Sequence, residues 1–306
     1  MLAAAQANWP TRPVRFVVSQ SAGGSIDIAA RTLGQKLSDS LGRQFLVENR
    51  PGANGMIAVD AAAKAGADGY TFLMSSPGPL TINRFVYKDV TYDTLKDFAP
   101  VTQTTSIAFL MVVNVNSPYK TVQDVVAAAK SRPGDIKYGS AGPGNQSHLA
   151  PEMLGQASGA TFLHVPYKGE APAIVDLLSG QIDFIIGTMP ALLQQVKAGK
   201  LRALAVCQKE RSRATPEVPT MTEAGYPAVE VTGWTGLLAP VGTSPQIVVQ
   251  LRDEVAKILG QPELAENLAK QGAEPVGSTP EQFASFIRAE TAKWGAAVRA
   301  AGLKPE

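Results

Sequence analysis

"VVSQSAGGSIDIAARTLGQKL", residues 17–37, begins as an apolar strand, breaks at a glycine-rich turn and continues with helical periodicity. Backbone N–H groups in the first turn of a helix lack helical partners, so a strand that feeds such a turn can hold an anion. The stretch therefore predicts an α/β fold whose first turn holds a nucleotide phosphate, a ligand carboxylate or no ligand. The apolar positions of the helix are Ile26, Ala30, Leu33, Leu37 and Leu41, and Gly42 ends it.

The composition limits the class of protein. The chain has 306 residues, 45% of them hydrophobic, which suits about two domains with cores of their own. The 28 basic and 26 acidic residues nearly balance and leave no electrostatic footprint for nucleic acid or an anionic membrane. The single cysteine, Cys207, excludes an intrachain disulfide and a cysteine-based metal cluster. We therefore expect no nucleic-acid partner, no metal and no cofactor.

The first residues, MLAAAQANWP (1–10), contain a run of small residues that ends in Ala5-Gln6-Ala7. This run matches the A-x-A cleavage pattern of a secretory signal. We interpret it as the end of an export signal that is cleaved before a mature chain starting near Asn8. The alternative is a frayed N-terminus without meaning. No stretch approaches the ~18 apolar residues of a membrane-spanning helix.

Strand and helix patterns alternate along most of the chain, which is typical of parallel sheets covered by helices. We expect strands at 14–20, 44–50, 70–76, 98–104, 109–115, 135–142, 161–169, 181–188, 201–208 and 229–240. Helices are expected at 54–65, 146–156, 170–180 and 190–199 besides the first one. After residue 240 the chain is expected to be helical to its end, with helix starts at Ser244-Pro245 and at Thr279-Pro280-Glu281-Gln282.

Two successive α/β units predict two doubly wound lobes. The strands 109–115 and 229–240 bracket the second unit, so the chain enters it on one strand and leaves it on the other. We therefore expect a two-stranded hinge and a ligand cleft between the lobes. The predicted boundaries are 1–108 with 231–306 for lobe 1, and 109–230 for lobe 2.

Two loops of the same kind end the first strand of each unit. Such loops lie beyond the carboxyl ends of the strands and would face each other across the cleft, where hydroxyls and helix N-termini suit a carboxylate. The alternative is that their glycines only make tight turns and their serines only cap helices. The first loop has Ser21, Ala22, Gly23, Gly24 and Ser25, and the second has Ser140, Ala141, Gly142, Pro143 and Gly144, followed by Asn145, Gln146 and Ser147.

Nucleotide and enzyme motifs are missing or incomplete. The segment 142–147, GPGNQS, has only two glycines of G-x-G-x-x-G, and no G-x-x-x-x-G-K-[ST] occurs. No G-x-S-x-G turn is present, and Ser147 and His148 are sequence neighbours whose side chains diverge. The sequence therefore predicts neither a dinucleotide site nor a serine hydrolase.

Several single residues are further candidates for the cleft. His148 is either a polar wall of the cleft or a packing residue, and Asp27 either favours the helix dipole or braces the loop or ligand. Tyr167 and Lys168 follow a strand and are expected at the cleft mouth. The other candidate polar contacts, at strand ends, are Ser75, Ser76 and Thr188.

The chain resembles the tripartite tricarboxylate transporter receptors, the TctC or Bug family of periplasmic solute-binding proteins. Matching pieces run in order over nearly the whole chain: "WPTRPVRFVV", "AGGSIDIAAR", "VENRPGANGMIA", "ADGYTFLMSS", "KDFAPVT", "YGSAGPGNQSHLA", "HVPYKG", "RALAV", "PEVPTMTEAGYP", "GWTGLLAP", "GAEPVGSTPEQFASFIRAE" and "KW". The resemblance implies a type II periplasmic binding fold that closes on a small carboxylate. It implies that the loops from 19 to 25 and from 140 to 147 hold this ligand.

Two positions depart from the family pattern. Many members are rich in proline or phenylalanine before the double glycine, where this chain has Ser19, Gln20 and Ser21, whose polar groups can face a ligand. Many members also carry an acid near Gly187 that can meet a ligand amine. Glycine there favours a carboxylate without a cationic group, or a bulkier ligand.

We therefore predict a monomeric periplasmic receptor that binds an organic carboxylate, performs no chemistry and passes its ligand to the membrane components of a tripartite tricarboxylate transporter. One alternative is a sensory module that docks on a signalling partner after closing. The other is a small-molecule enzyme on the same scaffold, which would depend on His148, Lys168, Asp27 and Asp183.

Overall fold

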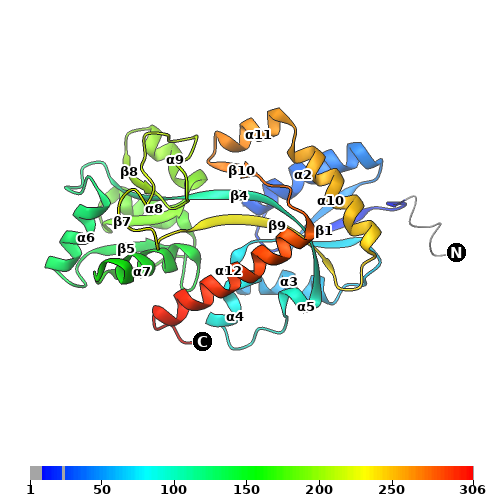
Figure 1. The fold of residues 1–306 in the computed structure, drawn as a ribbon, viewed down its shortest axis with the longest axis horizontal. Helices are drawn as coiled ribbons and strands as arrows, with labels where there is room; N and C mark the ends of the chain where they lie inside the picture. The colour runs from blue at the N-terminus through cyan, green and yellow to red at the C-terminus, as the bar shows by residue number, and fades with distance from the viewer. Residues whose placement is uncertain (1–8, 23–24, 306) are drawn as a thin grey trace.

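The computed structural model describes residues 9–22 and 25–305. It has two α/β lobes, and the long strands β4 (Phe98–Asn114) and β9 (Thr232–Pro240) run from one lobe into the other (Figure 1). Helix α12 (Pro280–Ala300) crosses alongside these two strands. The predicted export signal lies outside the described residues, and so do Gly23 and Gly24.

Each lobe contains the same three-stranded parallel arrangement, in which the first strand lies between the other two. The first lobe has the order β2 (Phe45–Asn49), β1 (Val14–Val18), β3 (Thr71–Ser75). The second has the order β6 (Leu163–Pro166), β5 (Lys137–Ser140), β7 (Phe184–Thr188). Strand β9 pairs antiparallel with β3, β4 pairs antiparallel with β7, and β4 and β9 pair with each other. The hinge strands therefore join both lobes into one continuous sheet.

The structure corrects two expectations about strands. The segments 98–104 and 109–115 are one strand, β4, and not two. The polar run between them interrupts the apolar signal but not the strand, because threonine suits extended backbone. The chain after residue 240 is also not purely helical, since β10 (Ala273–Pro275) pairs with β4 opposite Thr105, Ser106 and Ile107. A three-residue strand is too short to show a period of two.

Helices cover both faces of each lobe. In the first lobe α2 (Ser25–Leu41) and α10 (Pro245–Leu259) pack on one face, while α3 (Met56–Ala63) and α12 pack on the other. In the second lobe α6 (Val122–Ser131) and α7 (Gln146–Ser158) cover one face, while α8 (Glu170–Ser179) and α9 (Met189–Lys197) cover the other. The remaining elements are η1 (Ala53–Gly55), η2 (Gly78–Ile82), α4 (Asn83–Val86), α5 (Thr94–Asp97), β8 (Leu201–Val206) and α11 (Pro262–Ala269).

Local signals place several helix ends correctly. Gly42 follows α2 with a φ of 67°, a left-handed conformation that favours glycine. The Thr279 and Gln282 side chains form the predicted capping box at the start of α12. Helix α6 was not predicted from the sequence, although Thr121 and Asp124 form a second capping box there.

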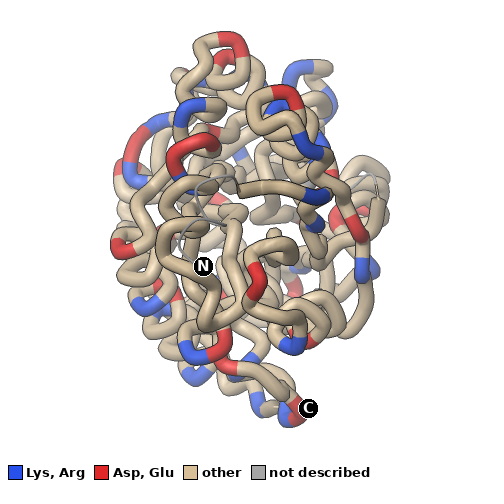
Figure 2. Tube along the Cα trace, turned by 90° about the vertical axis from the view of Figure 1, so that its right-hand side faces the viewer, with Lys and Arg blue, Asp and Glu red and all other residues tan. Residues whose placement is uncertain are grey.

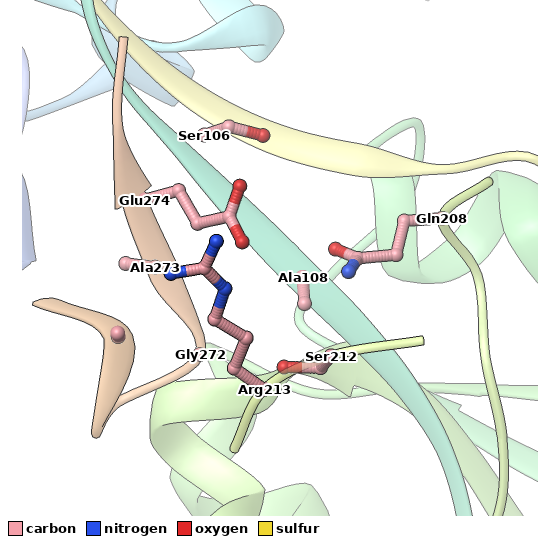
Figure 3. Close-up of a pocket in the computed structure, with 9 residues that line it drawn as sticks. Ser106, Ala108, Gln208, Ser212, Arg213, Gly272, Ala273 and Glu274 are labelled. Atoms are coloured by element: carbon pink, nitrogen blue, oxygen red, sulfur yellow. The ribbon is translucent and has the colours of Figure 1, made fainter. Parts of the chain in front are cut away.

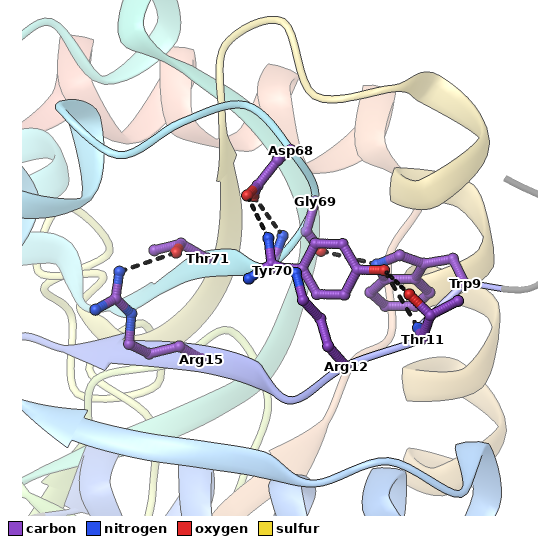
Figure 4. Close-up of polar contacts among 8 residues, drawn as sticks. All are labelled: Trp9, Thr11, Arg12, Arg15, Asp68, Gly69, Tyr70 and Thr71. Carbon is purple, nitrogen blue, oxygen red and sulfur yellow. Dashed lines mark hydrogen bonds and ion pairs between the residues drawn. The ribbon is translucent and has the colours of Figure 1, made fainter. Parts of the chain in front are cut away.

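The segment before β1 is fixed to the turn at Asp68 and Gly69 (Figure 4). The indole Nε1 of Trp9 donates a hydrogen bond of 2.8 Å to the carbonyl oxygen of Gly69, and Trp9 is 4% exposed. The Arg12 guanidinium pairs with Asp68 at 2.6 Å and lies 4.0 Å from the ring centre of Tyr70. These contacts fix the entry of β1 into the sheet, and therefore the place where its carboxyl end opens toward the other lobe.

Basic and acidic residues are scattered over the visible face without a large region of one sign (Figure 2). Among the residues described, no helix combines the length and apolar character needed to cross a membrane.

Candidate functional site

A cavity of about 720 Å³ lies between the lobes, at the carboxyl ends of β1, β3 and β7. Open parallel sheets bind ligands at this position, and the volume falls in the usual range of small-molecule sites. Apolar side chains from α2, α10 and α11 form much of one wall. The polar residues that line the cavity are Gln20, Thr32, Thr104, Thr105, Glu170, Thr188, Thr235, Asn267 and Gln271.

Three threonines of the hinge strands bring their hydroxyls together at this cavity. The Oγ1 atoms of Thr104 and Thr235 lie 2.5 Å apart, and those of Thr105 and Thr235 lie 2.6 Å apart. Adjacent residues of a regular strand point to opposite faces, but the β4–β9 register shifts between Gln103 and Thr105. This irregularity lets Thr104 and Thr105 both reach Thr235. The hinge thus supplies three clustered hydroxyls to the site.

The first predicted loop reaches the cavity through Gln20. The side-chain oxygen of Gln20 accepts a hydrogen bond of 2.9 Å from the backbone N–H of Ile26, at the start of α2. The Nδ2 of Asn49 donates to the Gln20 carbonyl oxygen at 3.0 Å and to Oδ1 of Asp27 at 2.8 Å. Asp27 is 2% exposed and also pairs with Arg31. Asp27 therefore braces the loop, which is one of the two roles expected for it.

The other residues predicted around this loop do not line the cavity. The hydroxyls of Ser19 and Ser75 share a buried hydrogen bond of 2.8 Å. Ser76 is half-buried, while Ser21 and Ala22 are exposed. The side chain of Ser25 lies outside the described residues.

The second predicted loop uses its polar groups internally. The Oγ of Ser147 accepts from the N–H of Ala141 at 2.9 Å and donates to Oδ1 of Asn145 at 2.6 Å. Asn145 caps α7, and the hydroxyl of Ser140 donates to the carbonyl oxygen of Gly142 at 3.1 Å. None of the residues from 140 to 148 lines the 720 Å³ cavity.

This second loop instead packs against the first lobe. A Cβ placed on Gly144 would lie 3.0 Å from the Val86 side chain of α4. The amide Nε2 of Gln146 donates to the carbonyl oxygen of Thr232 on β9 at 2.8 Å. The structure thus does not bring the two predicted loops together around this cavity.

The two histidines form a stack under the second loop. Their rings are 3.8 Å apart and nearly parallel, and the ring of Tyr138 stacks on His164 at 4.9 Å. His148 Nδ1 accepts from the N–H of Gly144 at 2.9 Å, and His164 Nε2 lies 2.6 Å from the hydroxyl of Ser140. His148 is 5% exposed and is a packing residue, not a wall of the cavity.

This stack makes the fold sensitive to acid. Burial, with repulsion from His164, lowers the pKa of His148 to about 4, and burial lowers that of His164 to about 4. The unfolded chain has histidine pKa values near 6.5, so it binds more protons between pH 6.5 and pH 4. Stability is therefore full above pH 6.5 and falls as the pH drops toward 4, by about 3 kcal/mol from the buried His148 and by a smaller share from the partly exposed His164.

Urea unfolding at several pH values between 4.5 and 7 measures this loss, and NMR titration of the two imidazoles measures its cause. The chain has 2 histidines, so the signals are simple to assign with one variant. Imidazole pKa values near 6.5 in the folded protein would contradict the prediction.

Tyr167, Lys168 and Gly187 also lie outside the cavity lining. The Tyr167 hydroxyl donates to Oδ2 of Asp176 at 2.6 Å, and Lys168 is exposed. Gly187 is buried, and a Cβ placed on it would lie 3.1 Å from Oε1 of Glu170. Thr188, the next residue, does line the cavity, as expected from its place at a strand end.

Glu170, at the first position of α8, lines the cavity and was not predicted from the sequence. Its Oε1 accepts from the N–H of Thr188 at 2.9 Å, and its Oε2 accepts from the Thr188 hydroxyl at 2.6 Å. Burial raises the pKa of the Glu170 carboxyl, while these two hydrogen bonds act in the opposite direction. The sequence predicted a contact at the nearby Lys168 instead, and no local pattern indicates Glu170.

The hinge threonines were also missed, although a signal for them exists. The run VTQTTS (101–106) places polar residues inside a long apolar strand. Strand positions facing a solvent-filled site tolerate hydroxyls that a packed core would not. Asn267 and Gln271 lie in and just after α11, and only the tertiary contact of β10 with β4 brings that region to the site.

A second, much smaller pocket lies beside the hinge, between β4, β10 and the segment after β8 (Figure 3). Its volume is about 10 Å³, about the room that one water molecule needs. The Arg213 guanidinium points toward the Glu274 carboxylate there. This pocket is too small for an organic ligand. No group of His, Cys, Asp or Glu side chains within 9–22 and 25–305 could hold a metal ion.

Comparison with known proteins gives a consistent result. The profile of the family described as "Tripartite tricarboxylate transporter family receptor" matches residues 29–303. "Protein BugT" of Bordetella pertussis is 39% identical over 297 residues, which are 97% of this chain and 91% of that protein.

Solved structures of similar proteins also match nearly the whole chain. "R. palustris Rpa4515 with adipate" is 37% identical, with a TM-score of 0.88 over 97% of this chain and 100% of that one. "MatC (Rpa3494) from Rhodopseudomonas palustris with bound malate" is 29% identical, with a TM-score of 0.82 over 95% of this chain and 100% of that one. These similarities confirm the predicted two-lobed α/β binding-protein fold.

Proposed function

Because the chain belongs to the tripartite tricarboxylate transporter receptor family, we propose that it captures a small organic carboxylate between its lobes and delivers it to a membrane transporter. As a member of that family it is a solute-binding protein and not an enzyme. We further propose that it acts in the periplasm, after export and cleavage of an N-terminal signal, and that it is a monomer.

The observation that carries this proposal is the cavity at the hinge, whose described lining residues offer hydrogen-bond donors but no basic side chain. Its lining includes Thr105 and Thr235, which carry hydroxyls, and Gln20, which carries an amide. The positive end of the α2 dipole lies next to Gln20, which caps the first turn of that helix. Hydroxyls and a helix N-terminus can hold a carboxylate without a cation. The adipate and malate in the two similar structures support a carboxylate as the ligand.

Ligand binding would close the lobes about the hinge. Two strands, β4 and β9, carry the chain between the lobes, so a bend at their irregular pairing changes the width of the cavity. We propose residues 109–230 as the lobe that moves relative to 1–108 and 231–306. A ligand that contacts both lobes stabilises the closed form, because it binds that form more tightly than the open one. The transporter would then recognise the closed form.

A thermal-shift comparison tests this function. Adipate and malate are compared with their dimethyl esters, which keep the carbon chain but lose the charge. At a concentration a hundred times its Kd, a bound ligand adds about 2.7 kcal/mol to stability. We expect a rise in melting temperature with at least one acid and no rise with its ester. Equal shifts with acid and ester would overturn the carboxylate proposal.

A further inference from the structure

Glu170 places a carboxyl group in the cavity. Its two carboxylate oxygens are held by the N–H and the hydroxyl of Thr188, at 2.9 and 2.6 Å. Both residues line the cavity, and both lie where a helix begins, Glu170 at α8 and Thr188 immediately before α9. Two helix N-termini favour the ionised carboxylate. The group is thus an oriented hydrogen-bond acceptor on the side of the second lobe.

Within the part of the chain that the structure describes, this carboxylate has no ion-pair partner. Glu170 is also the one charged residue among those that line the cavity there. Among the described residues its hydrogen bonds come from Thr188, although each carboxylate oxygen can accept more than one. A carboxylate that loses water without gaining a cation is costly, and a cationic donor brought beside it forms a strong, charge-assisted hydrogen bond.

Gly187 provides the space for this arrangement. A Cβ on Gly187 would lie 3.1 Å from Oε1 of Glu170, closer than most real Cβ contacts. Without a side chain at that position, the acid from α8 occupies the place beside the end of β7. The glycine itself favours a ligand without a cationic group, whereas Glu170 supplies an acid from another element.

The opposite side of the cavity has a different character. Thr105 and Thr235 present hydroxyls from the hinge, and Gln20 lies at the start of α2 on the first lobe. Apolar side chains such as Ile28 and Ile107 lie among the lining residues as well. The site therefore combines hydrogen-bond donors, an apolar wall and a carboxylate. In this order, these three features match the carboxylate, the carbon chain and the cationic end of one ligand.

We infer that Glu170 sets the ligand class of this cavity by binding the ammonium, or another cationic donor group, of a ligand whose opposite end is a carboxylate. This inference rests on the proposed function, because that function accounts for the carboxylate end. A dicarboxylate would place its second carboxylate beside that of Glu170, so we expect it to bind more weakly than the amino acid of the same length.

Calorimetry with two series of matched ligands tests the inference. In the longer series 5-aminopentanoate, hexanoate and adipate differ only in the group at the far end, which is ammonium, methyl or carboxylate. In the shorter series 3-aminopropanoate, butyrate and succinate differ in the same way. We expect the amino acid of at least one series to bind wild-type protein about tenfold or more tighter than its two partners.

The variant Glu170→Gln keeps an oxygen acceptor for Thr188 but removes the charge. We expect it to bind the amino acid about tenfold more weakly and the diacid of that series more tightly. Glu274→Gln is the matched control, because Glu274 is exposed on β10 and does not line the cavity, and its affinities should equal those of the wild type. Circular dichroism and the melting temperature verify that both variants fold.

The outcomes separate the two proposals. Hexanoate, adipate or their shorter counterparts binding as tightly as the amino acids would overturn the role of Glu170 and leave the carboxylate receptor intact. An unchanged preference in Glu170→Gln would do the same. Equal binding of 5-aminopentanoate and its methyl ester would instead overturn the carboxylate proposal. Binding of none of the six ligands would also overturn the inference.

Discussion

Replacing Glu290 with alanine is expected to lower the free energy of unfolding by about 3–5 kcal/mol. Glu290 lies on α12 and is 4% exposed. Its Oε2 accepts hydrogen bonds from the indole N–H of Trp234 at 3.0 Å and from that of Trp294 at 2.9 Å. Alanine would leave both buried indole donors without a partner and would leave Lys293 without its ion-pair partner. Each orphaned donor costs about 1–3 kcal/mol.

The contact matters because it joins the last helix to the hinge. Trp234 lies on β9, while Trp294 lies on the part of α12 that packs into the core of the second lobe. Urea unfolding followed by tryptophan fluorescence measures the loss. Glu290→Gln is the matched control, since its amide oxygen can still accept from an indole, and it should lose about half as much. A similar stability for Glu290→Ala and the wild type would show that the two indoles find other acceptors.

Replacing Gly236 with alanine is expected to destabilise the fold by about 2–3 kcal/mol through overpacking. Gly236 lies on β9 between Ser75 of β3 and Gln103 of β4. A Cβ there would lie 2.1 Å from Cζ of Phe283. The ring of Phe283 is fully buried and packs edge-on against Trp234, so it has little room to move away.

A double-mutant cycle identifies the cause. Phe283→Leu shortens the side chain opposite Gly236, so the double variant should be more stable than the sum of the single effects by about 1 kcal/mol or more. Gly66→Ala is the control, because a Cβ on Gly66 would meet no atom within 4 Å and its φ is not left-handed. Additive losses in Gly236→Ala and Phe283→Leu would rule out this clash as the cause. Denaturant unfolding of the four proteins of the cycle and of the Gly66→Ala control provides the measurement.

Local patterns identified many elements correctly. The apolar spacing from Ile26 to Leu41 predicts α2, and the glycine at 42 predicts its end, as both stand in the structure. The residues Thr279 and Gln282 predict the start of α12 correctly. Such features depend on hydrogen bonds and side-chain periodicity within a few residues, so they can be predicted without knowledge of the fold. Short elements such as β10 lack enough residues to show a period.

The candidate site was predicted less completely. Gln20 and Thr188 line the cavity because each lies at the carboxyl end of a strand. Ligand sites of open parallel sheets lie at these ends, so the order of the elements is enough to predict them. The second loop follows a strand in the same way, yet its serines and Asn145 bond to one another and its glycine packs on Val86. Whether a loop hydroxyl faces a ligand or its own backbone depends on contacts across a few ångströms, which a strand end does not reveal.

By itself the sequence determined the two α/β lobes, the strands that join them and the resemblance to a receptor family, because alternating apolar periods and motif order are properties of the chain. Only the tertiary structure decided which polar groups meet between the lobes. Thr105 and Thr235 are far apart in the sequence and meet through a register shift at the hinge. Glu170 lines the cavity next to Gly187, where a Cβ would come within 3.1 Å of its Oε1. Such contacts arise when separate elements pack, and no local pattern encodes them.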